Sequence, residues 1–296
     1  MVNRWQNVLF IALLLISGYA DADQPESIRL WAGQAPESLG DDEKDRPAIL
    51  KFTPAAADST DTAIVIFPGG GYGHLAMDHE GHQIANWLSQ NGVHAFICDY
   101  RHKGKGYRHP APMLDAKRAI RTVRSKATEL GFDPGKIGVL GFSAGGHLAS
   151  TVATHFDLGD ASSNDIIERQ SSRPDFAILC YPVIAMGTPF SHKGSRRNLF
   201  GKEASDETDR MFSNHLHVNK NTPPTFLWHC SDDTTVPVEN SIVFYQALVS
   251  SGVPAELHVY EKGGHGIGLA AGKSGAENWS DACISWLRAR QLLPTQ

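Results

Sequence analysis

The chain has 296 residues, of which 41% are hydrophobic and 20% are charged, and its formal net charge at pH 7 is -5. This is the balance of an ordinary globular protein that is long enough to bury one large α/β core. Because there is no surplus of basic residues to bind phosphates, the composition argues against a nucleic-acid-binding protein, and we expect no nucleic-acid partner.

The first 24 residues, MVNRWQNVLFIALLLISGYADADQ, have the pattern of a secretory signal peptide. Arg4 precedes an apolar run over residues 8–16, and Ala20 or Ala22 supplies a small residue for cleavage. The alternative is a membrane anchor, but the run is well short of the roughly 20 residues that span a bilayer. We therefore predict a signal peptide over residues 1–22 and one domain over 23–296, secreted or periplasmic, with no stable membrane insertion.

Short β-rich runs alternate with helical patterns through the rest of the chain. Strands are predicted at about 27–31, 49–53, 63–67, 94–98, 136–140, 176–180, 225–230 and 256–260, and helices at about 79–90, 112–129, 145–155, 239–251 and 277–290. This alternation predicts a mainly parallel sheet of about eight strands with helices on both faces. Two polar connections, 157–174 and 185–224, are predicted to form the rim or a small lid of a pocket beyond the strand ends.

Three of the four cysteines (Cys98, Cys180, Cys230 and Cys283) lie in or at the ends of predicted strands. Buried thiols are therefore expected for most of them. Cys180 and Cys230 both end strands that could be neighbours, so an oxidising compartment would allow them to form a disulfide. The sequence leaves that pairing open.

Ser143 lies in the stretch GFSAG, between Gly141 and Gly145. The predicted strand 136–140 precedes it and a helical pattern follows, so the stretch predicts a strand-to-helix turn that lifts the serine oxygen above the sheet. A serine that only caps a helix is the alternative, but an ordinary cap does not need a glycine on either side.

A serine hydroxyl needs a base to take its proton and a carboxylate to orient that base. In hydrolases built on such a turn, the acid and then the histidine follow the serine along the chain. Asp232 and Asp233 end one predicted strand, and His265 follows the next in a glycine-rich loop. His147 and His258 are interpreted as structural.

Five segments together resemble the α/β-hydrolase superfamily of the esterase/lipase type: IVIFPGGGYGHL, YRHPAPMLDAKRAIRTVR, VLGFSAGGHLAS, SDDTTVPVENS and HVYEKGGHGIG. Within it the sequence is similar to secreted bacterial carbohydrate esterases, including acetyl-xylan-esterase-like proteins. The family pattern D-x-x-V-P fits Asp233, which favours it over Asp232 as the third catalytic residue. The resemblance implies an α/β-hydrolase fold with Ser143, His265 and Asp233 as its catalytic residues.

An acyl-transfer enzyme also needs N–H donors for the oxyanion that forms on the carbonyl oxygen. The N–H of Ala144 is one candidate, and Gly70 and Gly71 of PGGGYG match the HGGG motif of esterases. Pro68 stands where that motif has a histidine. A phosphate-binding loop is the alternative, but the stretch lacks the Lys-Ser/Thr ending of a P-loop.

Residues near the expected pocket mouth are candidates for contacting a sugar, among them Tyr72, His74, Tyr100 and Arg196. His79, Glu80 and His82 lie together in MDHEGHQ, and His215 and His217 form a pair. Neither group has metal-ligand spacing, so we predict no metal and no cofactor.

The resemblance implies a secreted serine esterase that removes short acyl groups, acetyl above all, from a polysaccharide or oligosaccharide. A feruloyl-type esterase, a broad small-ester carboxylesterase and a peptidase of the same fold are rival enzymes. A catalytically silent binding module is the rival from another class. The sugar, the ester position, the acyl-chain limit and the oligomeric state stay open.

Overall fold

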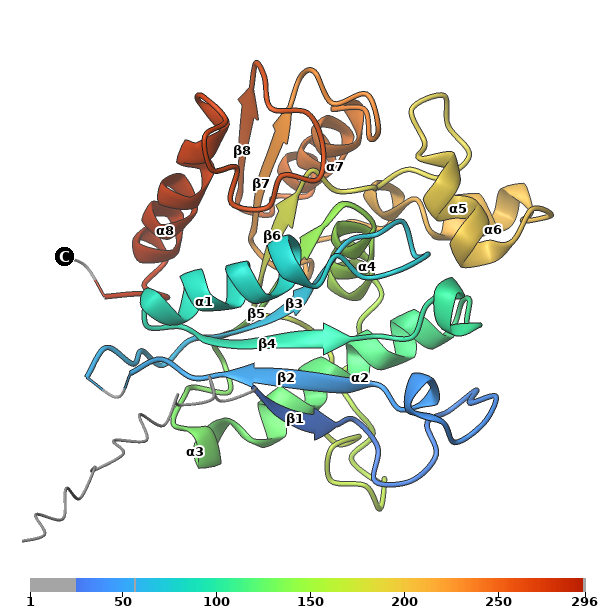
Figure 1. Ribbon diagram of the computed structural model, residues 1–296, viewed down its shortest axis with the longest axis vertical. Helices are drawn as coiled ribbons and strands as arrows, with labels where there is room; N and C mark the ends of the chain where they lie inside the picture. Colours follow the sequence, from blue (N-terminus) through green and yellow to red (C-terminus); the bar gives the residue numbers. More distant parts are fainter. Residues whose placement is uncertain (1–24, 56, 295–296) are drawn as a thin grey trace, which may run out of the picture.

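One eight-stranded sheet organises the chain in a computed structural model that describes residues 25–55 and 57–294 (Figure 1). Along the chain its strands are β1 (Glu26–Arg29), β2 (Ala48–Phe52), β3 (Ala63–Phe67), β4 (His94–Asp99), β5 (Ile137–Phe142), β6 (Phe176–Cys180), β7 (Thr225–Cys230) and β8 (Ala255–Tyr260). Their order in space is β1-β2-β4-β3-β5-β6-β7-β8. β2 runs antiparallel to both of its neighbours, β1 and β4, and all the other pairs are parallel, which confirms the mainly parallel sheet predicted from the sequence.

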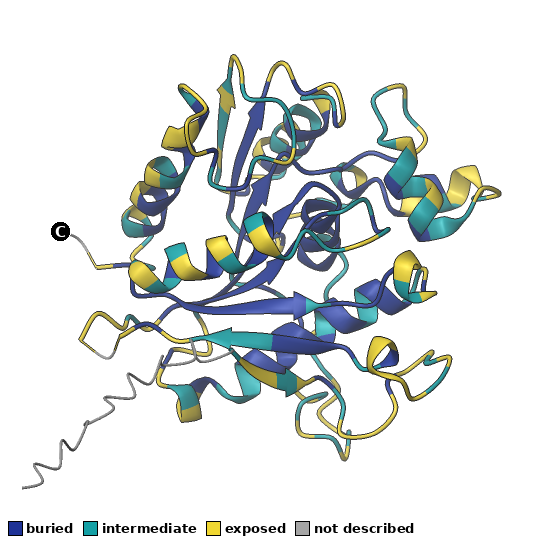
Figure 2. Ribbon diagram, viewed as in Figure 1, coloured by how far each residue is buried: buried dark blue, intermediate teal, exposed yellow. Residues whose placement is uncertain are grey.

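Helices cover both faces of this sheet. On one face α2 (Ala111–Ser125), α4 (Ser143–Thr154) and α7 (Glu239–Ser250) share a hydrophobic core with the strands. On the other face α1 (Gln83–Gln90) and α8 (Trp279–Ala289) share a second core. Every residue of β3, β5, β6 and β7 is buried, as the dark central strands of Figure 2 show. This double covering explains why those strands are continuous apolar runs.

Two of the predicted helices are interrupted in the structure. The helix expected at 79–90 begins with a π-helical turn, Asp78–His82, before α1 starts. The helix expected at 112–129 breaks at Lys126 into α2 and the short α3 (Ala127–Leu130). Hydrophobic periodicity predicts that a segment is helical, but it does not show where its hydrogen-bond pattern changes.

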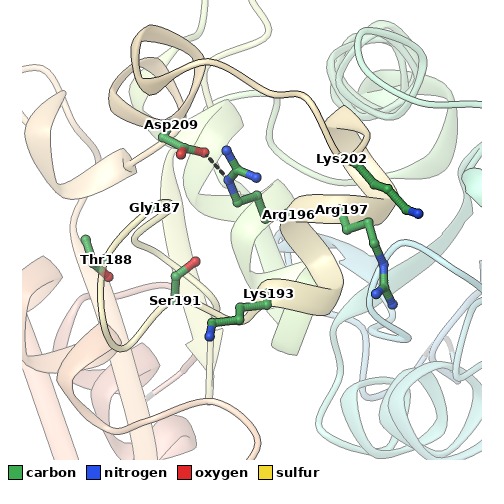
Figure 3. A pocket seen from close by; sticks show the side chains of 8 residues that line it. All are labelled: Gly187, Thr188, Ser191, Lys193, Arg196, Arg197, Lys202 and Asp209. Atoms are coloured by element: carbon green, nitrogen blue, oxygen red, sulfur yellow. Dashed lines mark hydrogen bonds and ion pairs between the residues drawn. The ribbon is translucent and has the colours of Figure 1, made fainter.

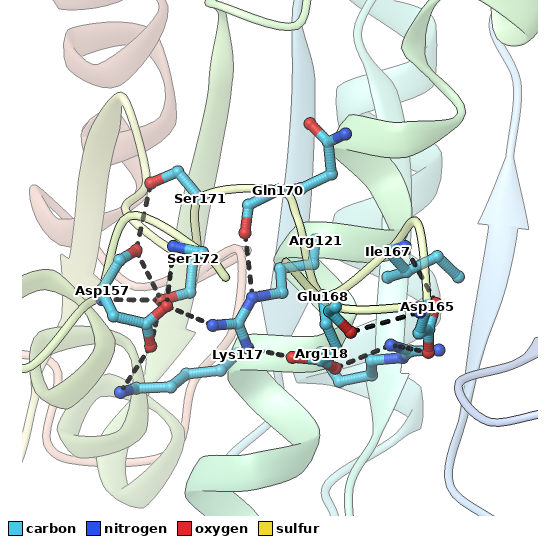
Figure 4. Close-up of polar contacts among 12 residues, drawn as sticks. Lys117, Arg118, Arg121, Asp157, Asp165, Ile167, Glu168, Gln170, Ser171 and Ser172 are labelled. Atoms are coloured by element: carbon cyan, nitrogen blue, oxygen red, sulfur yellow. Dashed lines mark hydrogen bonds and ion pairs between the residues drawn. The ribbon is translucent and has the colours of Figure 1, made fainter. Parts of the chain in front are cut away.

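The segment 157–174 does not form the pocket rim predicted for it. It lies along α2, where Arg121 binds the carboxylates of Asp157 and Glu168 (Figure 4). Arg118 and Arg124, which also lie on α2, bind further groups of the same segment. The prediction was wrong because this segment leads from a helix to the next parallel strand. Such a connection starts at the amino edge of the sheet, opposite the strand ends.

The second long connection, 185–224, leaves the carboxyl end of β6 and therefore begins at the strand ends. It contains α5 (Lys193–Phe200), α6 (Asp206–Met211) and a 3-10 turn, Asn214–Leu216. The side-chain amide of Asn198 donates to the carbonyl of Gly71, 2.9 Å away, in the loop after β3. This connection thus packs against the loop that contains the candidate N–H donors.

The four cysteines are all buried free thiols, so no disulfide joins Cys180 to Cys230. Burial also raises the pKa of both thiols. They pack in the core between the sheet and α8.

The predicted signal peptide, residues 1–22, lies outside the described residues. Among the residues that the structure does describe, none of the helices has the length and apolar character needed to cross a membrane.

The contacts of 157–174 with α2 predict a role in stability. Asp157→Asn removes the charge that pairs with Arg121 and Lys117. We expect it to lower the free energy of unfolding by about 1 kcal/mol, because the pair is partly exposed. Asp160→Asn is the control, since among the described residues the carboxylate of Asp160 bonds only to nearby Ser162 and the amide can keep an acceptor oxygen there. Urea denaturation measures both variants, and equal stabilities would contradict the assignment.

Candidate active site

Ser143 lies at the turn where β5 ends and α4 begins. Its φ of 52° is in the left-handed region, which is uncommon for a residue with a side chain. The carbonyl of Ser143 accepts a hydrogen bond from the N–H of Val183, 3.0 Å away, and this bond helps to hold the strained backbone. The residue is only 5% exposed. The structure therefore has the strand-to-helix turn expected around GFSAG.

The two glycines of this motif are required because backbone atoms of other residues lie where their Cβ atoms would be. A Cβ on Gly145 would lie 2.0 Å from the carbonyl oxygen of Phe67, at the end of β3. A Cβ on Gly141 would lie 2.2 Å from the carbonyl oxygen of Gly145. Neither glycine has a positive φ, so the backbone strain of the turn falls on Ser143 itself. The glycines allow α4 to start directly against the sheet.

Hydrogen bonds connect the serine to a histidine and an aspartate from two later loops. Nε2 of His265 lies 2.8 Å from Oγ of Ser143, and Nδ1 of His265 lies 2.6 Å from Oδ2 of Asp233. Asp233 follows β7 and His265 follows β8. Since a carboxylate only accepts, Nδ1 carries a proton and Nε2 accepts from the serine hydroxyl.

The carboxylate of Asp233 is held by several donors. Its Oδ1 accepts the N–H groups of Thr235 and Val236, both at 2.9 Å. On its other side Nε2 of the buried His229 lies 3.3 Å from Oδ2. Burial opposes ionisation of Asp233, but the hydrogen bonds from His229 and His265 outweigh it and hold the pKa of the carboxyl well below its usual range. Asp233 is therefore ionised beside the imidazole.

The neighbouring Asp232 has a different set of contacts. It is exposed, and its Oδ1 accepts the N–H of Gly264 at 2.8 Å. It therefore supports the loop that carries His265 without touching the imidazole.

The loop after β3 lies directly beside the serine. A Cβ on Gly69 would be 3.0 Å from the Cβ of Ser143. Among the described residues, the N–H groups of Gly70 and Gly71 donate no hydrogen bond. The N–H of Ala144 belongs to the first turn of α4, where such groups have no partner within the helix. Within the part of the chain that the structure describes, the N–H groups of Gly70, Gly71 and Ala144 thus have no hydrogen-bond acceptor outside the regular elements.

The two tyrosines proposed as sugar contacts face the core instead. Tyr72 is 1% exposed and donates its hydroxyl hydrogen to Nδ1 of His147, 2.8 Å away. The hydroxyl of the buried Tyr100 donates to the carbonyl of Pro68, 2.7 Å away. Tyr72 was therefore wrongly predicted to contact substrate, because its loop turns the ring inward. His74 is exposed on the same loop.

Arg196 lines a cavity of about 460 Å³ formed by the 185–224 connection (Figure 3). Its Nε lies 2.6 Å from Oδ1 of Asp209, so the guanidinium links α5 to α6. The cavity is also lined by exposed cationic side chains, Lys193, Arg197 and Lys202. Arg196 is thus paired within the protein, whereas the other three cations are exposed.

Several polar residues around this site make contacts that the sequence does not predict. His229 sits in β7 and looked like part of an apolar strand. Glu80 lies in the π-helical turn, and Tyr181 directly follows β6. Glu80 and Tyr181 bond to each other across 101 residues of the chain, so no local pattern predicts that contact. His229 lies only four residues before Asp233, and no motif marks it as a neighbour of that carboxylate.

No group of three or more potential metal ligands occurs in the described part of the chain. Glu80, which lies between His79 and His82 in the sequence, uses both carboxylate oxygens to accept hydrogen bonds from the protein.

A serine, an imidazole and a carboxylate connected in this order, on a strand-to-helix turn of a mainly parallel sheet, define the α/β-hydrolase class. The chain belongs to the BD-FAE family, whose model matches residues 51–248. The proteins that it is similar to include esterases and a probable carboxylic ester hydrolase.

Three known proteins show this similarity. A crystal structure titled as an acetyl ester-xyloside bifunctional hydrolase from Caldicellulosiruptor lactoaceticus is 44% identical, with a TM-score of 0.86, and the match covers 91% of this chain and 98% of that one. An acetylxylan esterase of Xylanibacter ruminicola is 37% identical over 70% of this chain and 41% of its own length. Endo-1,4-beta-xylanase B of Butyrivibrio fibrisolvens is 37% identical over 72% and 34%. The aligned region thus spans well under half the length of these two curated relatives.

The packing of the turn predicts that Gly145 tolerates no side chain. Gly145→Ala places a methyl group against the backbone of Phe67, and we expect it to cost at least about 2 kcal/mol of stability. Gly33→Ala is the control, because a Cβ there meets no atom within 4 Å. Thermal and urea denaturation compare the two variants. A Gly145→Ala protein as stable as the control would show that the turn is not closely packed.

Proposed function

We propose that this chain is a serine esterase that hydrolyses short acyl esters, acetyl above all, on a polysaccharide or its oligosaccharides. The continuous hydrogen bonding from Ser143 through His265 to Asp233 carries this proposal. It requires no metal or cofactor, because the three side chains supply a nucleophile, a base and a carboxylate that orients the base.

In the first half of the reaction Oγ of Ser143 attacks the ester carbonyl carbon while Nε2 of His265 takes the hydroxyl proton. Asp233 stabilises the imidazolium through the proton on Nδ1. The carbonyl oxygen becomes an oxyanion, which the N–H groups of Gly70, Gly71 and Ala144 are proposed to bind. The bond to the sugar oxygen then breaks, and His265 returns its proton to that oxygen.

In the second half water attacks the acyl-enzyme. His265 takes a proton from the water as its oxygen bonds to the acyl carbon, and a second oxyanion forms at the same donors. Collapse of this intermediate breaks the bond to Oγ, which takes its proton back from the imidazolium. The products are the free acid and the original enzyme, so atoms and charges balance.

The relatives support a carbohydrate ester as the substrate, since one is named an acetylxylan esterase and another an acetyl ester-xyloside bifunctional hydrolase. The sugar beyond the ester would lie toward α5, where the 185–224 connection forms its cavity. His74, exposed on the loop of the proposed oxyanion donors, is retained as a candidate sugar contact. Arg196 would act only by shaping this cavity, because its guanidinium is paired with Asp209.

Residues 1–22 support export of the protein, with the domain beginning after Ala20 or Ala22. The amino terminus of the protein recovered outside the cytoplasm tests this part of the proposal.

The main test is acetate release from acetylated xylo-oligosaccharides by the wild type and by Ser143→Ala. We expect release by the wild type and a loss of at least about 10,000-fold in kcat for the variant, because the nucleophile is gone. A folded wild type without activity on these substrates would contradict the carbohydrate assignment. Aryl esters of increasing acyl length would then show whether the protein is a broader esterase.

The two aspartates should differ sharply in their effect on turnover. Asp233→Asn puts an amide N–H toward Nδ1 of His265, which favours the tautomer that cannot take the serine proton. We expect kcat to fall by about 1,000-fold or more. Asp232→Asn keeps an oxygen for the N–H of Gly264, so its kcat should fall less than about 10-fold. Steady-state kinetics on an aryl acetate compares them, and the reverse order would make Asp232 the catalytic acid.

A further inference from the structure

Glu80 is a buried carboxylate next to the proposed active site. It is 2% exposed, and it lies on the π-helical turn before α1. Its Oε2 accepts the N–H of Gly69 at 2.9 Å, and its Oε1 accepts the hydroxyl hydrogen of Tyr181 at 2.8 Å. A Cβ on Gly69 would meet Oε2 at 2.5 Å and the Cβ of Ser143 at 3.0 Å. The carboxylate therefore lies directly behind the loop of the proposed oxyanion donors.

Tyr181 extends this connection to the loop of the proposed base. Its backbone φ is 36°, so the residue holds an unusual conformation just after β6. The hydroxyl that donates to Glu80 also accepts the N–H of Gly268 at 2.9 Å. The ring lies edge-on to the imidazole of His265, with 4.9 Å between the ring centroids. One carboxylate and one phenol thus join the loops after β3, β6 and β8.

The charge of Glu80 has little compensation from cations. No lysine or arginine in the described residues forms an ion pair with it, and its nearest basic group is Nε2 of His79, 3.9 Å from Oε1. Burial raises the pKa of Glu80, against the opposing effect of its hydrogen bonds. A buried carboxylate without a cation is costly for a fold, so stability alone does not explain its presence.

We propose that Glu80 and Tyr181 are positioning residues, which hold the oxyanion loop and the His265 loop at the separation that the reaction needs. This inference rests on the proposed esterase function. Neither side chain touches the reacting atoms. Their effect would be felt in the transition state, because a displacement of about 1 Å in a catalytic group can cost about 100-fold in rate.

The test uses Glu80→Gln, Tyr181→Phe and the double variant, with an aryl acetate as substrate. A glutamine has one acceptor oxygen for two donors, and a phenylalanine leaves the N–H of Gly268 and one oxygen of Glu80 unpaired. We expect kcat to fall about 10- to 100-fold in each single variant, with KM changed less than about 3-fold. The double variant should be no slower than the slower single variant, because all three break one connection.

Tyr107→Phe is a matched control in a different part of the molecule. Tyr107 also donates its hydroxyl hydrogen to a buried carboxylate, Asp45, and accepts a backbone N–H, that of Leu39 at 2.9 Å. Asp45 in turn accepts the N–H of Asp42, as Glu80 accepts that of Gly69. The control should lose thermal stability as Tyr181→Phe does, but keep its kcat.

Three results would overturn the inference: kcat in the Glu80 and Tyr181 variants as high as in Tyr107→Phe, losses that multiply in the double variant, or a loss that appears only in KM. If Glu80→Gln does not fold, Tyr181→Phe alone decides: a kcat as high as that of Tyr107→Phe, or a loss that appears only in KM, overturns the inference. An aryl acetate makes the test independent of the sugar. If the folded wild type hydrolyses no ester at all, the proposed function fails and the inference fails with it.

Discussion

The hydrogen bond between Ser143 and His265 joins the centre of the sheet to its last strand, and the site depends on the parallel pairing that makes this bond possible. β5, β6, β7 and β8 are consecutive neighbours, and their register keeps their carboxyl ends within two residues of one another: Phe142 pairs with Cys180, Cys180 with Trp228, and Cys230 with Tyr260. Residues that directly follow these strands therefore meet at one edge. A slip of one residue in a single pairing would turn every side chain of that strand to the other face.

Close packing around Ser143 holds the turn between β5 and α4 in one conformation. The glycines of GFSAG remove the side chains that would collide with the end of β3 and with α4. The serine then adopts its left-handed φ, and the bond from Val183 to its carbonyl holds it there. Local strain of this kind persists where the surroundings over-determine it, and it fixes the direction of Oγ.

The surroundings of two buried carboxylates near the site shift their pKa values in opposite directions. Asp233 has two backbone N–H groups and two imidazoles, and together they favour its charge despite burial. Glu80 has one N–H and one phenol, and burial dominates its pKa. The first carboxylate contacts the imidazole directly and can stabilise its positive form. The second contacts only loops, so its influence on the reaction is one of geometry.

The sequence by itself determined the strands, the strand-to-helix turn and the order of serine, aspartate and histidine along the chain, because periodicity and glycine spacing are local properties. It did not determine that 157–174 packs on α2, that Tyr72 turns into the core, or that Arg196 is bound by Asp209. Glu80 and Tyr181 are 101 residues apart, and no local pattern links them. Only the tertiary structure decided these contacts, since a buried polar group takes whichever partner the packing of distant segments brings within reach.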